Sequence, residues 1–242
     1  MDFVALVSGG KDSIYSIKCS IDQGHRLVGL LYMKNTSSYV DSYMYQTVGS
    51  EVVEHFGKCL DVPLFTSVSQ CKAIDTELNY TGDREDEVED LFKALSEIKK
   101  KIKFEAISSG AILSRYQKNR VEHVANRLNL VSLSPLWQRD QKILLKEMLD
   151  YEIEAFIVKV ASSSLDKSYL GKHIRSIYES NALLDDNYCG EGGEYESVVL
   201  DCPLFKYKLE YNDFTILNHP EEQDGFGSVF YCVFNGLRLI KK

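Results

Sequence analysis

Apolar and polar residues alternate in blocks along the first half of the chain, and the spacing within each block predicts strands and helices in turn. Residues 3–7 form a short apolar run that ends in Ser-Gly-Gly, a pattern typical of a buried central strand in a parallel sheet. After Asp12 the spacing changes, since isoleucines at i, i+3 and i+7 fall on one face of a helix that ends near Gly24. A second apolar run at 27–33 predicts a second strand, so the three elements predict a βαβ unit.

The same alternation continues as far as residue 133. It predicts helices at 43–60, 85–101 and 112–128, and strands at 63–68, 105–109 and 131–133. Helix 85–101 is strongly charged, and its expected buried stripe consists of Val88, Leu91, Phe92, Leu95 and Ile98. Strands that alternate with helices indicate an α/β fold, an open parallel twisted sheet with helices on both faces.

The pattern changes after Pro135, where short strands follow one another more closely. The expected helices are 140–149 and 172–183, and the expected strands are 155–160, 196–200, 206–211, 214–217 and 228–234. This mixture indicates a smaller α+β C-terminal domain. We therefore expect two domains, 1–130 and 131–242.

Charge and cysteine usage narrow the function classes. The 242 residues carry 28 Lys and Arg against 36 Asp and Glu, a net charge of −8. That balance disfavours general binding to nucleic acid, whose affinity comes largely from cations on phosphates. The six cysteines include no C-x-x-C pair, which argues against a zinc ribbon or an iron–sulfur site and favours a reduced, cytoplasmic protein. The first residues do not have the pattern of a secretory signal, so we expect none, and no apolar stretch reaches the ~20 residues of a membrane span.

The junction between the first strand and the first helix carries the most informative motif. It consists of Ser8, Gly9, Gly10, Lys11, Asp12 and Ser13. A helix N-terminus carries a partial positive charge, the glycines allow close approach of an anion, and Lys11 adds a full charge. Because open α/β sheets bind ligands at the carboxyl ends of central strands, this combination predicts a phosphate-binding loop. It differs from the Walker A pattern, and the alternative is a tight turn capped by Asp12 or Ser13.

These six residues resemble the PP-loop of the N-type ATP pyrophosphatases, which cleave ATP between the α and β phosphates. In that family the loop binds the departing pyrophosphate. The resemblance implies a HUP-like fold of the adenine nucleotide alpha hydrolase type, ATP and Mg²⁺ as cofactors, and adenylate chemistry. It also implies that the whole loop binds ATP and that Lys11 and Asp12 take part in catalysis.

Five further segments are similar to the diphthine–ammonia ligase family, and they follow one another in that family's order. They are 41–49, 86–91, 110–122, 135–141 and 189–205. The last segment, which begins Cys-Gly-Glu-Gly-Gly-Glu-Tyr-Glu, is far more specific than the PP-loop. The resemblance implies an ATP-dependent ligase that amidates the carboxylate of diphthine, a modified histidine of elongation factor 2, with ammonium. The implied route passes through an acyl-adenylate and gives AMP and pyrophosphate, in the last step of diphthamide biosynthesis.

Three carboxylates stand close together in that last segment, at Glu191, Glu194 and Glu196. Such a cluster can hold the trimethylammonium group of diphthine, bind Mg²⁺, or accept a proton from the attacking ammonium. The sequence leaves these three roles open, so all three glutamates are candidate catalytic residues. Gly192 and Gly193 between them are candidate substrate contacts, and the alternative is a Gly-Gly hairpin with exposed acids.

Aromatic and small residues complete the candidate site. Tyr195 and Trp137 are candidate faces for a quaternary ammonium. Gly110 and Ala111 follow a strand end and resemble the segment that abuts the adenosine in this family, where small residues allow close approach. A helix cap at Gly110 would be compatible with that role.

One further group of residues offers candidate substrate contacts, namely Tyr45, Gln46, Tyr116, Gln117 and Arg120. The first two face the nucleotide or the substrate, or they lie on a partly buried helix face. The other three share one predicted helix. Arg120 can neutralise phosphate, and the alternative is a structural ion pair with Glu122 or another acid.

The resemblance leaves two rival functions open. Some PP-loop enzymes modify tRNA, although the net charge of −8 argues against this function. A non-catalytic adenine-nucleotide-binding module would share the fold, because fold alone does not determine function. We expect free or partner-delivered ammonium, since residue 2 is Asp and not a catalytic cysteine. We expect two partners: elongation factor 2 that carries diphthine, and ammonium. We expect binding to neither nucleic acid nor a membrane.

Overall fold

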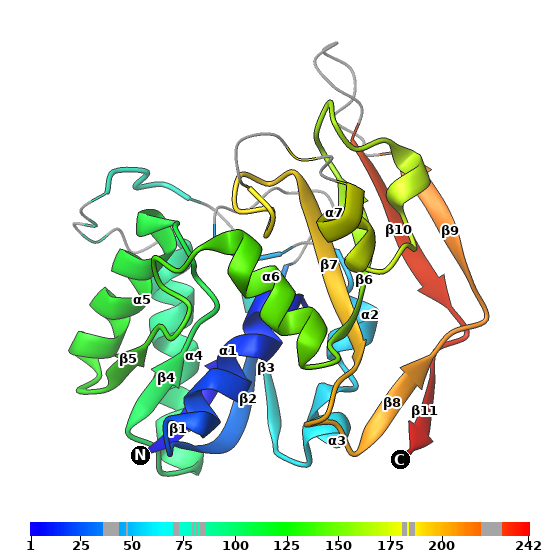
Figure 1. Cartoon of the computed structure of the whole chain (residues 1–242). Helices are drawn as coiled ribbons and strands as arrows, with labels where there is room; N and C mark the ends of the chain where they lie inside the picture. The colour runs from blue at the N-terminus through cyan, green and yellow to red at the C-terminus, as the bar shows by residue number, and fades with distance from the viewer. Residues whose placement is uncertain are drawn as a thin grey trace. The chain divides into compact units, whose positions relative to one another are not determined.

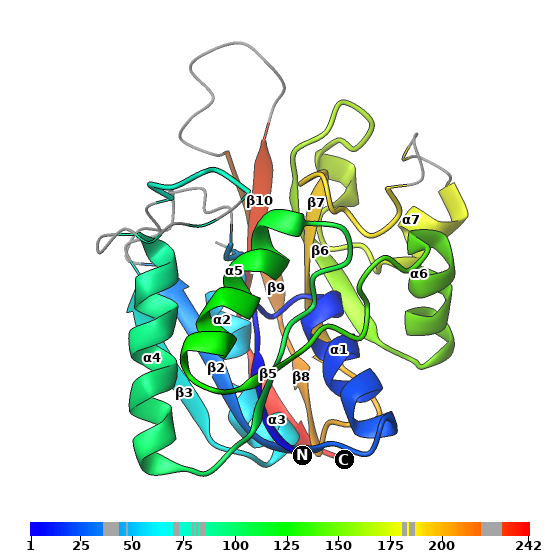
Figure 2. The same ribbon diagram turned by 90° about the vertical axis from the view of Figure 1, so that its left-hand side faces the viewer.

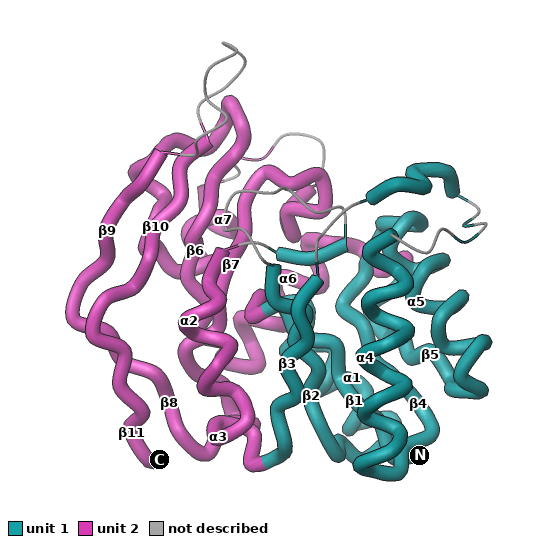
Figure 3. Tube along the Cα trace, turned by 180° about the vertical axis from the view of Figure 1, so that it is seen from behind, with its two compact units in different colours: residues 1–8, 12–47, 62–137 teal, residues 9–11, 48–61, 138–242 magenta. Residues whose placement is uncertain are grey.

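A computed structural model of the chain describes residues 1–35, 44–46, 48–69, 73–78, 80, 82, 86–180, 183, 187–218 and 229–242. The chain divides into two compact units, each discontinuous in sequence. Unit 1 comprises Met1–Ser8, Asp12–Thr47 and Val62–Trp137, and unit 2 comprises Gly9–Lys11, Val48–Asp61 and Gln138–Lys242. Figure 3 colours the two units separately.

Within the described residues, unit 1 is built on a five-stranded parallel sheet with the order β3-β2-β1-β4-β5 (Figure 1). The strands are β1 (Asp2–Leu6), β2 (Arg26–Asn35), β3 (Leu64–Ser69), β4 (Ala106–Ser108) and β5 (Val131–Leu133). Each strand lies where an apolar run predicted it, within two residues at most ends. The predicted open parallel sheet is therefore confirmed.

Helices cover both faces of this sheet, as predicted. They are α1 (Lys11–Asp22), α4 (Glu87–Lys101) and α5 (Arg115–Arg127). Figure 2 shows α1 on one side of the sheet and α4 with α5 on the other. Val4 and Ile107 belong to the buried cluster that α4 and α5 complete. Ser108 faces the opposite side, where its hydroxyl lies 3.1 Å from that of Ser20 in α1, because successive strand residues point to opposite faces.

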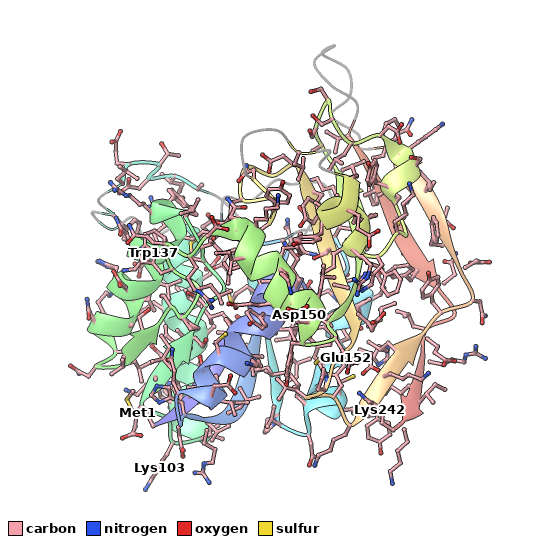
Figure 4. The ribbon with its side chains drawn as sticks, in the orientation of Figure 1. Met1, Lys103, Trp137, Asp150, Glu152 and Lys242 are labelled. Carbon is pink, nitrogen blue, oxygen red and sulfur yellow. The ribbon has the colours of Figure 1, made fainter. Side chains whose placement is uncertain are left out.

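The strand order of unit 1 changes direction at β1, which has β2 on one side and β4 on the other. In open α/β sheets, ligands bind beyond the carboxyl ends of the strands at such a switch. The segments after β1 and β4 contain the predicted phosphate loop and Gly110. Figure 4 shows Trp137 at this carboxyl edge and Met1 with Lys103 at the opposite edge.

The described part of unit 2 contains a four-stranded antiparallel sheet with the order β7-β6-β10-β9 and a separate two-stranded pair. The larger sheet consists of β6 (Glu154–Val160), β7 (Tyr195–Asp201), β9 (Asp213–Asn218) and β10 (Phe230–Asn235). The pair consists of β8 (Tyr207–Glu210) and β11 (Arg238–Lys241). The helices are α2 (Ser50–Val53), α3 (Phe56–Leu60), α6 (Gln141–Asp150), α7 (Arg175–Ser180) and the 3₁₀ turn η1 (Lys167–Tyr169).

This unit confirms the predicted smaller α+β part. The functional division of the chain into 1–130 and 131–242 stays a prediction. None of the described helices is long and apolar enough to cross a membrane.

The predicted helix 43–60 is wrong in its extent. Residues 44–46 are not helical, and the described remainder contains the two short helices α2 and α3, while residues 43 and 47 lie outside the described residues. Gly49 has a left-handed φ of 92° immediately before α2, which breaks a continuous helix.

Helices α5 and α7 also differ in extent from the prediction. Helix α5 begins at Arg115 and not at residue 112, because the hydroxyl of Ser114 accepts the backbone N–H of Gln117 and caps the helix there. Helix α7 is shorter than the predicted 172–183, whose residues 181–182 lie outside the described residues. Strand β11 was not predicted. Residues 41–43, 85 and 228, which belong to other predicted segments, also lie outside the described residues.

Candidate active site

The phosphate loop makes a turn that requires glycine at Gly9. Gly9 has a φ of 98°, which L side chains rarely adopt. A Cβ at this position would also lie 2.7 Å from Cγ2 of Val53 in α2. The Gly9 carbonyl accepts the backbone N–H of Val199 in β7 at 2.9 Å. The backbone of Gly9 is therefore fixed beside β7.

Lys11 is almost fully buried, with 2% exposure. Its Nζ donates to the carbonyl oxygen of Cys189 at 2.5 Å and lies 4.8 Å from the centroid of the Tyr195 ring. Its backbone N–H donates to Oγ of Ser197 at 3.4 Å. A buried ammonium needs such partners because desolvation of a charge is costly. Lys11 is thus held against the segment that carries the predicted catalytic glutamates, a link that the sequence did not predict.

The first turn of α1 and the segment after β4 approach each other closely at Gly110. A Cβ on Gly110 would lie 2.8 Å from the carbonyl carbon of Asp12 and 2.9 Å from the nitrogen of Ser13. Ala111 is buried beside it. Among the remaining loop residues, Gly10 and Ser13 are buried, while Ser8 and Asp12 are half-buried. The close backbone contact explains why a small residue stands after β4.

Ser109, which sequence reasoning missed, adds a polar group at the same edge of the sheet. It is 7% exposed, and no hydrogen-bond partner for its hydroxyl exists among the described residues. Buried polar atoms normally have a partner. The Ser109 hydroxyl is therefore a candidate contact for a ligand at this edge of the sheet. Its position directly before Gly110 was the signal that could have found it.

The variant Gly110→Ala is expected to raise the KM for ATP about tenfold, because the new methyl must push the β4 segment away from the first turn of α1. Steady-state amidation at varied ATP measures this change. Gly24→Ala is the control, since Gly24 has a φ of 84° and its Cβ would meet nothing within 4 Å. It strains the backbone without touching the loop. An unchanged KM in Gly110→Ala would contradict the role of this contact.

The acidic loop, residues 187–194, closes around the carboxylate of Glu194. Oε2 of Glu194 accepts the backbone N–H of Gly192 at 3.0 Å, and Oε1 accepts the side-chain N–H of Asn187. A Cβ on Gly192 would lie 2.5 Å from Oε1 of Glu194 and 2.8 Å from Nδ2 of Asn187. Gly193 follows with a φ of 84°. The two glycines therefore shape the loop so that Glu194 can fold back onto it.

Glu196 lies outside this loop, on β7, and pairs with a lysine that sequence reasoning missed. Nζ of Lys159 in β6 lies 3.3 Å from Oε1 of Glu196, and Lys159 is 7% exposed. The register of β6 and β7 shifts between Ile157 and Lys159. Such a bulge re-aims a side chain and is common beside active sites. The sequence contained one indication of this role, because Lys159 stands among apolar residues in the run that forms β6.

Lys159→Met is expected to destabilise the protein by about 3 kcal/mol, because it leaves the carboxylate of Glu196 partly buried without its cation. The double variant Lys159→Met/Glu196→Gln removes both charges and is expected to recover most of that stability while amidation stays low. Urea unfolding and amidation rates of the same samples separate the two effects. Full recovery of amidation in the double variant would contradict a catalytic role for Glu196.

The three predicted glutamates occupy separate positions. Glu191 and Glu194 are both half-buried in the acidic loop, where Glu194 accepts the backbone N–H of Gly192, and Glu196 lies on β7 beside Lys159. Among the described residues, no three His, Cys, Asp or Glu side chains come together as ligands for a metal. Binding of Mg²⁺ by this chain stays a prediction.

The two predicted aromatic faces differ in their surroundings. Tyr195 is 3% exposed, its hydroxyl donates to the carbonyl oxygen of Tyr188 at 2.7 Å, and the cation over its ring is Lys11. Trp137 is half-buried, and Nζ of Lys118 lies 5.3 Å from its ring centroid. A contact of either ring with a quaternary ammonium stays a prediction.

Arg120 is fully buried in unit 1. Its guanidinium donates to the carbonyl oxygens of Asp75 and Glu77 and lies 3.3 Å from the centroid of the Tyr116 ring. The carboxylate of Asp75 lies 3.9 Å away, whereas Glu122 pairs with Lys118. This arrangement corresponds to the structural alternative, an ion pair with an acidic residue. A contact of Arg120 with phosphate stays a prediction.

The remaining candidates are partly buried and lie on two segments of unit 1, residues 44–46 and helix α5. Burial raises the pKa of Tyr116 to about 12, so its hydroxyl stays protonated at neutral pH. The hydroxyl of Tyr45 donates to the carbonyl oxygen of Glu87 at 3.3 Å. Gln46 and Gln117 are half-buried. Their contacts with substrate stay predictions.

Comparison with known proteins covers both parts of the chain. The family model of the diphthamide synthase N-terminal domain matches residues 1–132, and that of the C-terminal domain matches residues 140–229. Curated proteins named diphthine–ammonia ligase from Bos taurus and Homo sapiens are each 42% identical over 252 residues, covering 100% of this chain and 94% of each relative. One from Schizosaccharomyces pombe is 38% identical over 240 residues, covering 96% of this chain and 40% of the relative.

Among solved structures, a predicted subunit of tRNA methyltransferase from Methanocaldococcus jannaschii matches 84% of this chain and 98% of its own, with 18% identity and a TM-score of 0.40. That similarity is too low to bear on fold or function. The family models and the curated relatives, in contrast, agree over nearly the whole chain. Their agreement shows that the chain belongs to the diphthamide synthase family and is a ligase that forms C–N bonds.

Proposed function

We propose that this ligase amidates the carboxylate of diphthine on elongation factor 2 with ammonium, at the expense of ATP, as the last step of diphthamide biosynthesis. The names of the curated relatives support the substrate. One observation carries the proposal: the ammonium of Lys11, from the PP-loop, is bound to the carbonyl of Cys189 in the acidic loop. This contact joins the anion-binding motif to the motif that is most specific to the family.

The proposed chemistry has two steps. A carboxylate oxygen of diphthine first bonds to the α-phosphorus of ATP, and the bond from that phosphorus to the oxygen bridging to the β phosphate breaks, so pyrophosphate leaves. The nitrogen lone pair of ammonia then forms the C–N bond, AMP leaves with the electrons of the C–O bond, and a base takes the proton. A carboxylate is a poor electrophile, and adenylation gives it a leaving group.

The residues take the following proposed roles. The loop 8–13 binds the departing pyrophosphate, whose charge Lys11 neutralises, and Gly110 with Ala111 borders the adenosine. Residues 1–130 bind ATP, which arrives as its Mg²⁺ complex, and residues 131–242 bind the diphthine side chain. The acids at 191, 194 and 196 serve the second step, either by holding the trimethylammonium or by accepting the proton.

Three of the five described cysteines are poor candidates for releasing ammonia from glutamine. Burial raises the pKa values of Cys59, Cys202 and Cys232 to about 12, so these thiols stay protonated at neutral pH and are poor nucleophiles. Release of ammonia from glutamine by such a thiol is therefore disfavoured. The five described cysteines all carry free thiols, which favours a reducing compartment and hence the cytoplasm.

Analysis of the nucleotide product tests this function. The protein is incubated with ATP, Mg²⁺, ammonium and diphthine-bearing elongation factor 2, AMP and ADP are separated, and the factor is weighed by mass spectrometry. We expect AMP only when both other substrates are present, together with the mass change from acid to amide. ADP alone would contradict the proposed role of the phosphate loop. Tight binding of ATP without turnover would favour the nucleotide-binding module, and modification of added tRNA would favour the tRNA enzyme.

A further inference from the structure

One side chain from outside the acidic loop makes two hydrogen bonds to that loop. It belongs to Gln141, the first residue of α6, which is 7% exposed. The start of this helix is fixed because the carboxylate of Asp140 accepts the backbone N–H of Ile143 at 2.8 Å. Gln141 therefore enters the loop from a rigid element.

Both the oxygen and the nitrogen of the Gln141 side-chain amide form hydrogen bonds. Oε1 accepts the backbone N–H of Cys189 at 2.8 Å, and Nε2 donates to Oδ1 of Asn187 at 2.7 Å. The thiol of Cys189 also donates to the backbone carbonyl of Gln141 at 3.4 Å. Three contacts thus tie the start of α6 to the first residues of the acidic loop.

The hydrogen bonds continue in one direction from Gln141 to Glu194. Asn187 accepts from Gln141 and donates through Nδ2 to Oε1 of Glu194. An ionised carboxylate only accepts, so Glu194 requires the NH₂ group of Asn187 to face it, and the oxygen of Asn187 must then face Gln141. The NH₂ group of Gln141 is thereby directed to Asn187, and its oxygen to Cys189. The carboxylate of Glu194 therefore determines the orientation of the Asn187 amide, which in turn determines that of the Gln141 amide.

The other branch of the network reaches Lys11. The backbone carbonyl oxygen of Cys189 accepts a hydrogen bond from the Lys11 ammonium at 2.5 Å. The backbone N–H of the same residue donates to Oε1 of Gln141. Gln141 thus sets the position of the carbonyl that orients Lys11 and, through Asn187, the carboxylate of Glu194. These are the cation and one of the acids that the proposed reaction needs.

We propose that Gln141 is a positioning residue for amidation, which holds the acidic loop so that Lys11 and Glu194 keep their reactive orientations. The proposal rests on the function proposed above. In this proposal Gln141 acts through other residues of the chain and not by contact with ATP or diphthine. Its effect is transmitted by Cys189 to the ATP side of the reaction and by Asn187 to the acid.

Two substitutions test this role. Gln141→Glu keeps the acceptor for Cys189 and suits a helix N-terminus, but it places a carboxylate oxygen against Oδ1 of Asn187. Gln141→Leu keeps the size and removes both hydrogen bonds. Gln23→Glu is the control, since it makes the same chemical change at an exposed position after α1.

We expect Gln141→Leu, which loses both hydrogen bonds, to raise the KM for ATP about tenfold while the KM for elongation factor 2 changes by less than about twofold. Gln141→Glu keeps the acceptor for Cys189 and is expected to raise the KM for ATP less. A purely structural role would lower the fraction of folded enzyme, and would therefore reduce kcat and leave both KM values unchanged. That result, or wild-type kinetics in both variants, would overturn the proposal. Gln23→Glu is expected to match the wild type.

Calorimetric titration with ATP separates this inference from the proposed function. It needs no turnover, so about tenfold weaker binding of ATP by Gln141→Leu is expected even if the wild type forms no amide. Equal ATP affinity in wild type and Gln141→Leu would overturn the inference whatever the reaction is. If the wild type forms no amide but still binds ATP about tenfold more tightly than Gln141→Leu, only the proposed function is contradicted.

The direction of the hydrogen bonds gives a second measurement. In the double variant Gln141→Glu/Glu194→Gln, the direction of the hydrogen bonds can reverse. If the side-chain amide of Asn187 rotates by 180°, its NH₂ group donates to the new carboxylate at position 141. Its oxygen then accepts from the new amide at position 194. We expect the thermal midpoint of this double variant to lie above that of Gln141→Glu alone. A midpoint at or below that of the single variant would contradict the network.

Discussion

Lys11→Met is expected to lower the kcat/KM for amidation by about 10²- to 10³-fold. Methionine has about the length of lysine, but it has no charge with which to neutralise the departing pyrophosphate, the role proposed for Lys11. The loss is large because Lys11 is 2% exposed, and a charge in a buried site is only weakly screened by water. Amidation rates at subsaturating ATP measure the effect, and circular dichroism shows that the variant is folded.

The matched control is Lys18→Met on the same helix. Lys18 pairs with Asp22 at 2.5 Å near the end of α1, an i,i+4 pair of the kind that contributes little to stability. Its amidation rate is expected to stay within about twofold of the wild type, since surface pairs contribute at most ~1 kcal/mol. Near-normal kcat/KM in folded Lys11→Met would show that this lysine does not act on the leaving group.

The parallel sheet of unit 1 was predictable because its signals are local. The apolar runs of β1 and β2 are bounded by turn residues, and helix α4 shows a helical stripe with Val88, Leu91, Leu95 and Ile98 buried. Phe92, the fifth expected member, is only partly buried; it packs against that core, and the guanidinium of Arg127 from α5 lies 3.9 Å from its ring centroid. Periodicity predicts which residues share a helix face, but it does not specify which side chains of another helix contact them.

The failures of prediction have equally specific causes. Helix 43–60 was expected from apolar spacing, yet Gly49 adopts a left-handed φ and ends any continuous helix there. Strand β11 has four residues, too few for a reliable period. The sheet of unit 2 places β10 between β6 and β9, and the pairing of β6 with β10 joins segments far apart in sequence. Local patterns do not specify such partners.

In the candidate site, too, local motifs were predictable and long-range contacts were not. The PP-loop was recognisable because its six residues are contiguous between β1 and α1. The partners of its lysine were not, since Cys189 and Tyr195 come from a distant segment. Lys159 and Gln141 were missed for the same reason, because each acts through a residue that only the fold brings near. Sequence motifs located the groups, and tertiary contacts define how they are held.

Glu194→Ala is expected to reduce amidation by about 10²-fold or more. The substitution removes the acceptor of the Gly192 N–H and of the Asn187 amide, so the acidic loop loses the group around which it closes. The stability cost is expected to be modest, about 1–2 kcal/mol, because each hydrogen bond contributes about 1 kcal/mol and the loop is partly exposed. Single-turnover amidation, measured well below the unfolding midpoint, separates the two effects.

Glu194→Gln sharpens this test, because it changes few atoms. The new amide still offers an oxygen to Gly192, but its NH₂ group then faces the NH₂ group of Asn187, which cannot turn while its oxygen accepts from Gln141. We therefore expect Glu194→Gln to lose nearly as much activity as Glu194→Ala. Glu210→Ala, which removes an exposed partner of Lys208, is expected to be neutral. Near-normal amidation by Glu194→Gln would mean that neither the charge of Glu194 nor its place in the network matters, and the catalytic acid would then be sought at Glu191 or Glu196.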